Sequence, residues 1–489
     1  MTSGGNGAFD VAIIGGGING AGIARDAAGR GARVLLLEAG DLACGTSSKS
    51  TKLIHGGLRY LEHGEFALVH EALAEREALM AIAPHLIRPM RFVLPHASGL
   101  RPAWLLRAGL FVYDHMGGRK RLPATDTVLL NRHPAGGPLK PGYRIGFEYS
   151  DGWVDDARLV VANAVDARER GADIRPRTPL ASARRVAGGW ELATPAGPFR
   201  AAALVNAAGP HVLDVQARAG EAPAMAMRLV RGSHIVVRRL FDHAYAYFFQ
   251  LPDGRIFFAI PYERDFTLIG TTDADHHGSL DRIEPSEAEV AYLCEGVNRY
   301  FAKGISPADV VWRFAGVRPL IEDNSGRPEA ATRGYRLHLS EADEGAPLLT
   351  VYGGKITTYR HLAEEATSLL ARRVPALTGK PWTKDRALPG GDFPVDGLDD
   401  LKARIAGRFG WLDAANVDRI ARAYGTRVFG WLSDDCGRDL GGGLTEAEVG
   451  YLVREEWART ADDVLWRRTK AGLHMTADQC AAVAALLGT

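Results

Sequence analysis

The alternation of apolar and polar positions predicts an α/β unit at the start of the chain. Residues 11–14 and 34–37 are short apolar runs, typical of strands buried in a parallel sheet. We expect an alanine-rich helix between them, since glycines end that stretch just before the second run. Residues 66–83 repeat apolar side chains at helical spacing, and this second helix is expected to end before Pro84.

The middle of the chain changes to the period of a sheet. β-branched and aromatic side chains gather in four runs, and a Pro-Asp-Gly turn at 252–254 separates two of them. These runs are residues 236–237, 245–249, 256–260 and 266–269. We expect them to form an antiparallel sheet, inserted between pieces of the first domain.

The residues after Trp382 predict a separate helical domain, linked through the Pro-Gly-Gly stretch at 389–391. Three threonines stand three residues before an acidic or amide side chain, the arrangement of a capping box at a helix start. The pairs are Thr445 with Glu448, Thr460 with Asp463, and Thr476 with Gln479. Five of the nine tryptophans, enough for a small core, also fall here: Trp382, Trp411, Trp431, Trp457 and Trp466.

Composition and charge narrow the class of protein. A chain of 489 residues is too long for one core, and 46% hydrophobic with 24% charged residues is ordinary for globular domains. The 59 basic and 58 acidic residues balance, which argues against nucleic acid as a partner. The cysteines lie far apart, so we expect no metal site and no disulfide framework, as in a reducing cytosol. They are Cys44, Cys294, Cys436 and Cys480.

The chain lacks the sequence features of a membrane-spanning or exported protein. No apolar run reaches 18 residues, and residues 1–8 are small and polar, without the apolar core of a signal peptide. We therefore expect the protein to work inside the cell, in solution or on a membrane surface.

A glycine fingerprint marks a candidate nucleotide site. Gly15, Gly17 and Gly20 have the spacing of a dinucleotide-binding turn, although chance alone gives about one such match in a chain this rich in glycine. The context makes the match specific, because the glycines follow a predicted strand, open a helix, and precede Glu38 at the end of the next strand. A carboxylate there is suited to bind ribose hydroxyls, while the helix start faces a pyrophosphate. These residues leave the choice between FAD and NAD open.

Two later segments favour a flavin. Residues 204–205 lead into Asn-Ala-Ala-Gly-Pro at 206–210, a strand that ends in residues too small to obstruct a ligand. Residues 348–352 lead into Gly353, Gly354 and Lys355 and then a helical stretch. A helix start and a lysine would stabilise the negative charge that develops on a flavin when it is reduced.

Several longer strings resemble one enzyme family, the FAD-dependent glycerol-3-phosphate dehydrogenases. The resemblance runs in order from about residue 9 to about residue 480. Its strings are GGGINGAG at 15–22, SSKSTKLIHGGLRY at 47–60, WVDDARL at 153–159, GSH at 232–234, GTTD at 270–273, GVRPL at 316–320, YGGK at 352–355 and ADDVLWRRTK at 461–470.

The resemblance implies the fold of the D-amino-acid-oxidase-like flavoproteins: a Rossmann-type α/β domain that binds FAD, an inserted antiparallel-sheet substrate domain and a C-terminal helical domain. On this basis we assign residues 8–70, 150–225 and 345–378 to the FAD-binding domain, 71–149 and 226–344 to the substrate or cap domain, and 379–489 to the helical domain. The sequence ends about twenty residues after its last shared motif. It therefore looks like the bacterial form, without the calcium-binding extension of mitochondrial members.

The resemblance also implies an activity: oxidation of sn-glycerol 3-phosphate to dihydroxyacetone phosphate with non-covalent FAD, and electron delivery to a membrane quinone. A histidine suits removal of the hydroxyl proton, since its ordinary pKa is near 6.5; His55 is our first choice and His234 the second. Arginine forks bind a phosphate dianion, and Lys355 has a role toward substrate or flavin. The expected substrate-binding residues are Arg59, Tyr60, Arg318 and Arg333.

The motif and the resemblance together give a set of FAD-binding candidates. They are Gly15, Gly17, Ile18, Asn19, Gly20, Glu38, Ala39, Thr46, Ser47, Ser48, Lys52, Leu53, His55, Gly56, Gly57, Ala207, Ala208, Gly209, Gly353, Gly354, Lys355, Ile356 and Thr357. Asp155 is left out of the site, because it precedes a helical run and is better interpreted as an N-cap.

Residues 104–113 are a candidate membrane contact. They combine Trp, Leu, Phe and Val and are flanked by Arg101, Arg119, Lys120 and Arg121, a pattern that suits an anionic bilayer at the inner face of the cell membrane. A buried helix explains the same pattern equally well. The sequence also leaves open an oxidase that uses oxygen, an amine or amino-acid oxidase of the same fold, a flavin- or nucleotide-binding regulator without catalysis, and a homodimer.

Overall fold

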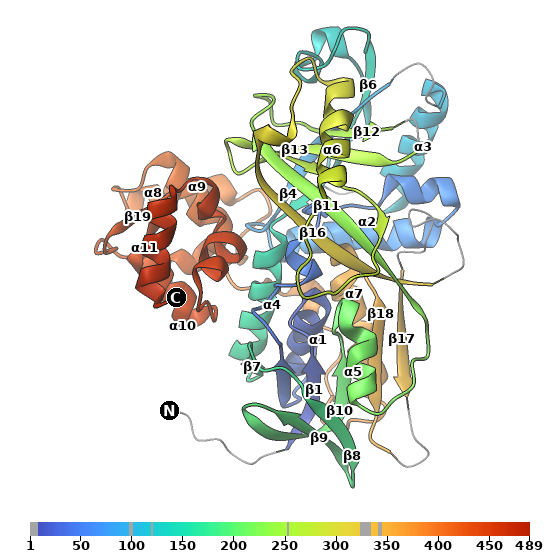
Figure 1. Ribbon diagram of the computed structural model, residues 1–489, viewed down its shortest axis with the longest axis vertical. Coiled ribbons are helices and arrows are strands. Elements are labelled where there is room, and N and C mark those ends of the chain that lie inside the picture. Colours follow the sequence, from blue (N-terminus) through green and yellow to red (C-terminus); the bar gives the residue numbers. More distant parts are fainter. Residues whose placement is uncertain (1–7, 97–100, 119–120, 252–253, 323–333, 341–344) are drawn as a thin grey trace.

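The computed structural model describes residues 8–96, 101–118, 121–251, 254–322, 334–340 and 345–489. Figure 1 shows two stacked α/β parts and a third, helical lobe at one side, beside α4. The predicted fold class is confirmed: an α/β FAD-binding fold, a second sheet inserted into it, and a C-terminal helical domain.

The first sheet is a parallel sheet with one antiparallel edge strand. Its order is β17 (Tyr335–Ser340), β18 (Leu348–Gly353), β10 (Gly197–Asn206), β1 (Phe9–Ile14), β2 (Val34–Leu37) and β7 (Asp173–Arg175), and the hairpin β8 (Ser182–Val186) and β9 (Gly189–Thr194) extends β10. The helices α1 (Ile18–Gly29), α4 (Asp156–Glu169) and α7 (Tyr359–Leu370) supply one hydrophobic core with it, and α5 (Val212–Arg218) lies toward the other face. β1 and β2 are the two apolar runs predicted as buried parallel strands.

The second sheet is largely antiparallel, as predicted. Its order is β15 (Ala274–Asp275), β11 (Met227–Arg238), β14 (Phe266–Gly270), β13 (Ile256–Tyr262), β12 (Ala246–Gln250), β4 (Ile87–Pro95), β6 (Ile145–Val154) and β3 (Leu53–Ile54); β16 (Val310–Ile321) also pairs with β11, and β5 (Asp126–Leu129) with β6. All four predicted runs fall on strands of this sheet, except that Tyr245 lies one residue before β12. Part of the turn expected at 252–254 lies outside the described residues.

The sheet alternates side chains between two covered faces. On β11, Ile235 and Val237 pack into the core that includes residues of α6 (Glu287–Tyr300), whereas Val236 packs into the core toward α2 (Phe66–Ile82) and α3 (Ala103–Met116). Successive strand residues point to opposite faces, so His234 shares the face of Val236. The helix α2 ends before Pro84, as its periodicity predicted.

Two of the expected domain boundaries separate residues that the structure joins in one sheet. β17 pairs with β18 in the first sheet, although residues 226–344 were expected in the substrate domain. Residues 150–154 were expected in the FAD-binding domain, but they end β6 of the second sheet. Strand pairing decides both: β17 pairs with β18, which itself pairs with the distant β10, and β6 pairs with the distant β4.

The C-terminal lobe is built from α8 (Leu398–Arg408), α9 (Ala414–Tyr424), α10 (Glu446–Glu455), a π-helical turn (Asp463–Arg468), α11 (Ala477–Leu487) and the small hairpin β19 (Asp439–Gly441) and β20 (Leu444–Thr445). Thr476 with Gln479 forms a complete capping box. Thr445 caps α10, but the Glu448 side chain binds Arg419 and Tyr424 instead of closing the box. Thr460 and Asp463 exchange both hydrogen bonds, and the turn that follows is π-helical.

The tryptophans of this last part do not all serve its core. The core consists mainly of aliphatic and tyrosine side chains, with Trp431 and Trp466 at its margin. Trp382 instead lies against Gly29 of α1, with the guanidinium of Arg170 4.0 Å above its ring centroid. Trp457 packs against the core of the first domain. These two large rings help to hold the lobe to the first domain.

Candidate functional site

The glycine turn between β1 and α1 is held by close backbone contacts. Gly15 has φ 113°, and a Cβ there would lie 2.5 Å from the Ala207 carbonyl oxygen. A Cβ on Gly20 would lie 1.9 Å from the Gly15 carbonyl oxygen. These positions therefore require glycine, and they bring the end of β10 against the start of α1.

The end of β10 leaves room beside this turn. Ala208 donates its N–H to Asn206 Oδ1 at 3.3 Å, and Gly209 has φ 58°. A Cβ on Gly209 would meet no atom of the described residues within 4 Å. The predicted Ala207–Gly209 segment thus lies next to the glycine turn without filling the space beside it.

Glu38 lies at the end of β2, followed by Ala39 in a loop. Its Oε2 accepts a hydrogen bond from the Gly16 N–H at 2.6 Å, and its Oε1 accepts one from the Gly40 N–H at 2.7 Å. The carboxylate is therefore fixed beside the glycine turn. Its predicted role as ribose acceptor agrees with this place and remains a prediction.

The segment after this loop crosses the start of α1. Ser47 Oγ accepts the Ile18 N–H at 3.0 Å, and Thr46 Oγ1 donates to the Val317 carbonyl oxygen at 2.6 Å. Ser48 Oγ is buried and has no hydrogen-bond partner among the described residues. The segment joins the first nucleotide turn to β16 of the second sheet.

Lys52 is a buried ion-pair partner. Its Nζ lies 2.8 Å from Asp156 Oδ1 and donates to the Ser48 carbonyl oxygen at 3.2 Å. Both side chains are almost wholly buried. Since Asp156 already compensates the ammonium charge, Lys52 shapes the backbone of this segment, and its direct contact with FAD remains a prediction.

The third nucleotide segment meets the same helix start. Asn19 Nδ2 donates to the Gly353 carbonyl oxygen at 3.4 Å, and a Cβ on Gly354, where φ is 101°, would lie 2.8 Å from that nitrogen. Asn19 Oδ1 is buried without a hydrogen-bond partner among the described residues. Lys355 Nζ lies 3.9 Å from the ring centroid of Tyr60, a cation–π contact.

His55 stands where the two domains meet. It follows β3, in which Leu53 pairs with Trp153, and its backbone N–H donates to Thr357 Oγ1 at 3.4 Å; Thr357 and Ile356 form the turn after Lys355. The His55 ring lies edge-on to Phe258 of β13, with 6.5 Å between centroids. The structure thus brings His55, Thr357 and the second sheet together.

A buried polar cluster fixes the backbone beside His55. The Gly56 N–H donates to the Tyr113 hydroxyl at 2.8 Å, which donates in turn to Asp151, and Arg76 Nη1 lies 2.6 Å from Asp151 Oδ1. Burial raises the pKa of Tyr113 well above its usual range. Gly57, with φ 77°, continues the turn. No local pattern predicts this cluster, because its members come from four separate segments.

His234 lies on the sheet face that contacts residues 46–52, referred to below as the FAD-binding segment. Its ring stacks on Phe314 of β16 at 4.9 Å, and Nε2 lies 3.0 Å from Thr51 Oγ1. The neighbouring strand contributes Gly270, where a Cβ would lie 2.0 Å from the imidazole. Burial, with Arg318 and Lys52 nearby, holds the pKa of His234 well below 6.5, so the ring is neutral near pH 7.

His55 and His234 approach the same face from different sides. In the antiparallel register, His234 pairs with Gly270 and Gly270 pairs with Phe258, whose ring contacts His55. Directly paired residues point to the same face. His234 and Phe258 therefore lie on one row of the sheet, two strands apart, and His55 packs against the Phe258 end of that row.

Arg318 lies flat across a glycine on the same face. Its Nη2 donates to Thr271 Oγ1 at 2.9 Å, and a Cβ on Gly232 would lie 2.4 Å from that nitrogen. Its Nη1 lies 2.6 Å from Asp273 Oδ1 in a partly buried ion pair. The motif strings at 232–234, 270–273 and 316–320 thus meet in space, and Thr271 and Asp273 are contacts that the sequence did not single out.

Two predicted arginines lie beyond what the structure describes. Arg333 is outside the described residues, and for Arg59 only the backbone, in the 3-10 helix Leu58–His63, is described.

Asp155, which we excluded from the site, is the N-cap of α4, as predicted: its Oδ1 accepts the Arg158 N–H at 3.1 Å.

The assembled segments suit a bound dinucleotide. The carboxyl ends of β1, β2, β10 and β18 meet at one edge of the first sheet, where α/β folds bind nucleotides. The start of α1 supplies backbone N–H groups, Glu38 supplies a carboxylate, and the buried Asn19 Oδ1 and Ser48 Oγ still lack partners among the described residues.

Two family models match nearly the whole chain. The model described as FAD dependent oxidoreductase matches residues 10–360, and the model described as C-terminal domain of alpha-glycerophosphate oxidase matches residues 381–488. The chain belongs to the FAD-dependent oxidoreductase family. It is a flavoenzyme, and its cofactor is FAD, as the sequence predicted.

Curated relatives match over the full length. A glycerol-3-phosphate dehydrogenase of Pseudomonas aeruginosa is 51% identical, covering 96% of this chain and 93% of the relative. A D-erythritol 1-phosphate dehydrogenase of Brucella abortus is 50% identical, covering 97% and 96%. A solved structure of the glycerol-3-phosphate dehydrogenase from Bacillus halodurans complexed with FAD matches with a TM-score of 0.75 and 27% identity, covering 95% of this chain and 86% of that one. The predicted resemblance is confirmed.

Proposed function

We propose that this flavoenzyme oxidises sn-glycerol 3-phosphate to dihydroxyacetone phosphate. The observation that carries the proposal is the arrangement of Arg318 and His234 on one sheet face, opposite the FAD-binding segment and with His55 at its edge. A guanidinium suits a phosphate, and an imidazole suits the proton of the hydroxyl group to be oxidised. FAD, when bound, supplies the acceptor for the hydride.

The roles of the two histidines differ in this proposal. His234 is buried, and its low pKa makes it a weak base, while its Nε2 is engaged by Thr51. We therefore assign proton removal to His55 and positioning of the substrate to His234. Arg318 binds the phosphate, helped by Tyr60, Arg59, Arg333 and Lys355.

A four-carbon substrate is the second candidate. The relative from Brucella abortus, named a D-erythritol 1-phosphate dehydrogenase, is almost as similar as the relative named a glycerol-3-phosphate dehydrogenase. Both substrates combine a phosphate with a secondary alcohol, so the residues named above serve either one.

Anaerobic mixing of the purified yellow protein with each polyol phosphate tests the proposal. We expect glycerol 3-phosphate to bleach the flavin absorbance band faster than D-erythritol 1-phosphate at equal concentration. The reverse order would assign the enzyme to the four-carbon substrate. Bleaching by neither, but by an amino acid or amine, would replace the proposal with an oxidase of that class.

We further propose that the enzyme works on the inner face of the cell membrane and passes electrons to quinone. The support is α3, where Trp104 is 72% and Phe111 is 55% exposed, with Leu105 and Val112 exposed beside them. The opposite side of the helix buries Leu110 and Tyr113 in the second domain. Its apolar face is therefore available to lie among lipid headgroups.

Charge and topology agree with a surface attachment. Arg101 and Arg121 flank α3 and are exposed, whereas Arg119 and Lys120 lie outside the described residues. No helix in the described part of the chain is long and apolar enough to cross a bilayer.

Flotation with anionic vesicles at low and high salt, run beside a peroxide assay, tests the proposed membrane attachment and electron acceptor. We expect salt-sensitive vesicle binding and little peroxide; no binding, with peroxide equal to product, would instead indicate an oxidase.

A further inference from the structure

The loop after Glu38 closes over the glycine turn. Besides the bond from Gly16 to Glu38, the Ala43 N–H donates to the Gly16 carbonyl oxygen at 3.1 Å. A Cβ on Gly16 would lie 2.9 Å from Leu42 Cδ2, so the loop is in van der Waals contact with the turn. Residues 38–44 therefore fix the position of the N–H groups that begin α1.

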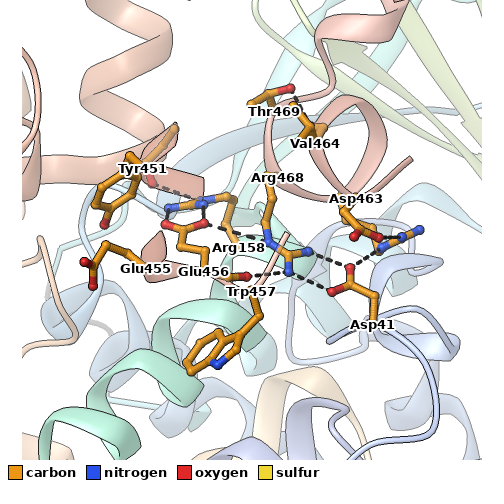
Figure 2. A network of polar contacts seen from close by, with 12 residues as sticks. Asp41, Arg158, Tyr451, Glu455, Glu456, Trp457, Asp463, Val464, Arg468 and Thr469 are labelled. Carbon is orange, nitrogen blue, oxygen red and sulfur yellow. Dashed lines mark hydrogen bonds and ion pairs between the residues drawn. The ribbon is translucent and has the colours of Figure 1, made fainter. Parts of the chain in front are cut away.

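Asp41 ties the same loop to the C-terminal domain. Arg468 donates to it through both terminal nitrogens, Nη1 to Oδ2 at 2.7 Å and Nη2 to Oδ1 at 2.8 Å, and Arg467 Nε donates to Oδ2 at 2.6 Å. The Arg468 side chain is 0% exposed. Figure 2 shows Arg468 reaching from the C-terminal domain to Asp41 of the first domain.

The two arginines are themselves held in place. Arg468 Nη2 donates to the Glu456 carbonyl oxygen at 2.7 Å, and Arg467 pairs with Asp463. Asp463 accepts two backbone hydrogen bonds, from Arg459 at 2.7 Å and Thr460 at 2.9 Å. The π-helical turn that begins at Asp463 brings both neighbouring arginines to the single carboxylate of Asp41.

Lys470 makes a second contact between the C-terminal domain and the first domain, at the start of α4. Lys470 Nζ lies 3.2 Å from Asp155 Oδ1. The next residue, Asp156, accepts hydrogen bonds from the Ser50 hydroxyl at 2.7 Å and from Lys52 at 2.8 Å. Residues 46–52 are thus supported through the start of α4.

We propose that the C-terminal domain is a brace for FAD binding, and that Arg467, Arg468 and Lys470 are its positioning residues. They hold residues 38–52 in the arrangement that meets the cofactor, although they are not expected to touch it. The proposal rests on the FAD contacts predicted from the sequence for Glu38 and Ser47. Because coupling is reciprocal, bound FAD also strengthens the docking of the C-terminal domain.

Two contacts that avoid this loop serve as controls, one between the domains and one within the C-terminal domain. Arg168 Nη2 lies 2.8 Å from Glu455 Oε2, joining α4 to α10. Glu448 accepts hydrogen bonds from Arg419 at 2.7 Å and Tyr424 at 2.6 Å wholly within the C-terminal domain, and is itself buried. A Glu448→Gln variant therefore weakens that domain without touching Asp41.

The test compares Asp41→Asn and Arg467→Gln with Glu448→Gln and Arg168→Gln. Apoprotein of each full-length variant is titrated with FAD below its melting temperature, and the dissociation constant is read from flavin fluorescence. We expect an increase of tenfold or more for Asp41→Asn and a smaller one for Arg467→Gln. Changes within twofold are expected for both controls, even where their melting temperatures fall further.

Hydrogen exchange supplies a readout that loss of stability alone does not produce. In the unmodified protein, FAD should slow amide exchange in residues 463–470, and in Asp41→Asn this protection should disappear. Equal FAD affinity in Asp41→Asn and Glu448→Gln, or no protection of residues 463–470, would overturn the proposal. No substrate is used, so failure of the proposed oxidation leaves the result interpretable.

Discussion

His234 Nε2 and Thr51 Oγ1 lie 3.0 Å apart, joining the substrate-side sheet to the segment that precedes His55. Thr51 belongs to the long motif string in the FAD-binding region, and His234 belongs to a strand nearly two hundred residues later. Stacking on Phe314 and contact with Gly270 leave the imidazole little freedom. These contacts fix the ring and burial keeps it neutral, which is why we assign proton removal to His55.

Replacing the histidines separately should distinguish their roles. We expect His55→Asn to slow flavin reduction by glycerol 3-phosphate by about 100- to 10,000-fold, the usual contribution of a general base. His234→Asn should mainly raise KM, since that ring is assigned to positioning. Anaerobic stopped-flow measures both; a larger loss of rate in His234→Asn would exchange the assignments.

Arg318→Ala should weaken substrate binding far more than cofactor binding. Leaving a bound phosphate without its guanidinium partner costs about 2–5 kcal/mol, so KM should rise roughly 30-fold or more. Arg313→Ala is the matched control, because Arg313 lies on the same strand in an exposed pair with Glu287. Near-normal kinetics in Arg318→Ala would remove this residue from the site.

Glu38→Ala should lower the affinity for FAD. The variant loses both the expected acceptor for the ribose hydroxyls and the carboxylate that accepts the Gly16 and Gly40 N–H groups. We expect the FAD dissociation constant to rise about fivefold or more, from roughly 1–3 kcal/mol of lost hydrogen bonding. Flavin fluorescence titration measures the change, with Glu191→Ala, a partly exposed residue of β9, as control; unchanged affinity would show that the ribose lies elsewhere.

The exposed face of α3 should govern membrane binding. Trp104→Ser with Phe111→Ser should reduce partition into anionic vesicles at least tenfold, since each ring buried in lipid contributes about 1.5–3 kcal/mol. Trp411→Ser is a suitable control, because Trp411 is an exposed aromatic residue of the C-terminal domain. Activity with a soluble dye should be unchanged in all three proteins. Equal flotation of the α3 variant and the control would exclude α3 as the attachment.

His85 should make stability fall in mild acid. Burial and the nearby Arg158 lower the pKa of His85 to about 3, whereas an unfolded histidine titrates near 6.5. Between these values the unfolded chain binds the proton and the folded protein does not, so stability decreases as the pH falls below 6.5. The loss due to this group is about 1.4 kcal/mol by pH 5.5.

Urea unfolding at pH 7.5 and 5.5 measures this effect. His85→Gln, which cannot titrate, should show a decrease smaller by about that amount. An equal decrease in both proteins would assign the acid sensitivity to other groups.

Local signals in the sequence identified individual elements well. The Asp155 cap, the Thr476 capping box and the end of α2 before Pro84 all follow from interactions within a few residues. The place of β17 could not be predicted in this way, because it pairs with β18, whose position in the first sheet depends on parallel pairing with the distant strand β10. Trp382 likewise belongs by sequence to the last part but lies by packing against α1.

The sequence alone determined the chemistry that this protein can support. The glycine spacing, Glu38 and the motif strings specify a dinucleotide fold and a flavoenzyme family, because they depend on backbone conformations and residue types that only a few side chains permit. The tertiary structure decided which of these residues meet. Arg318 lies over Gly232, His234 over Gly270, and Arg468 on Asp41, and each contact joins segments that are distant in the chain. Such contacts depend on strand register and domain packing, which are set by the summed burial of many side chains and not by any local pattern.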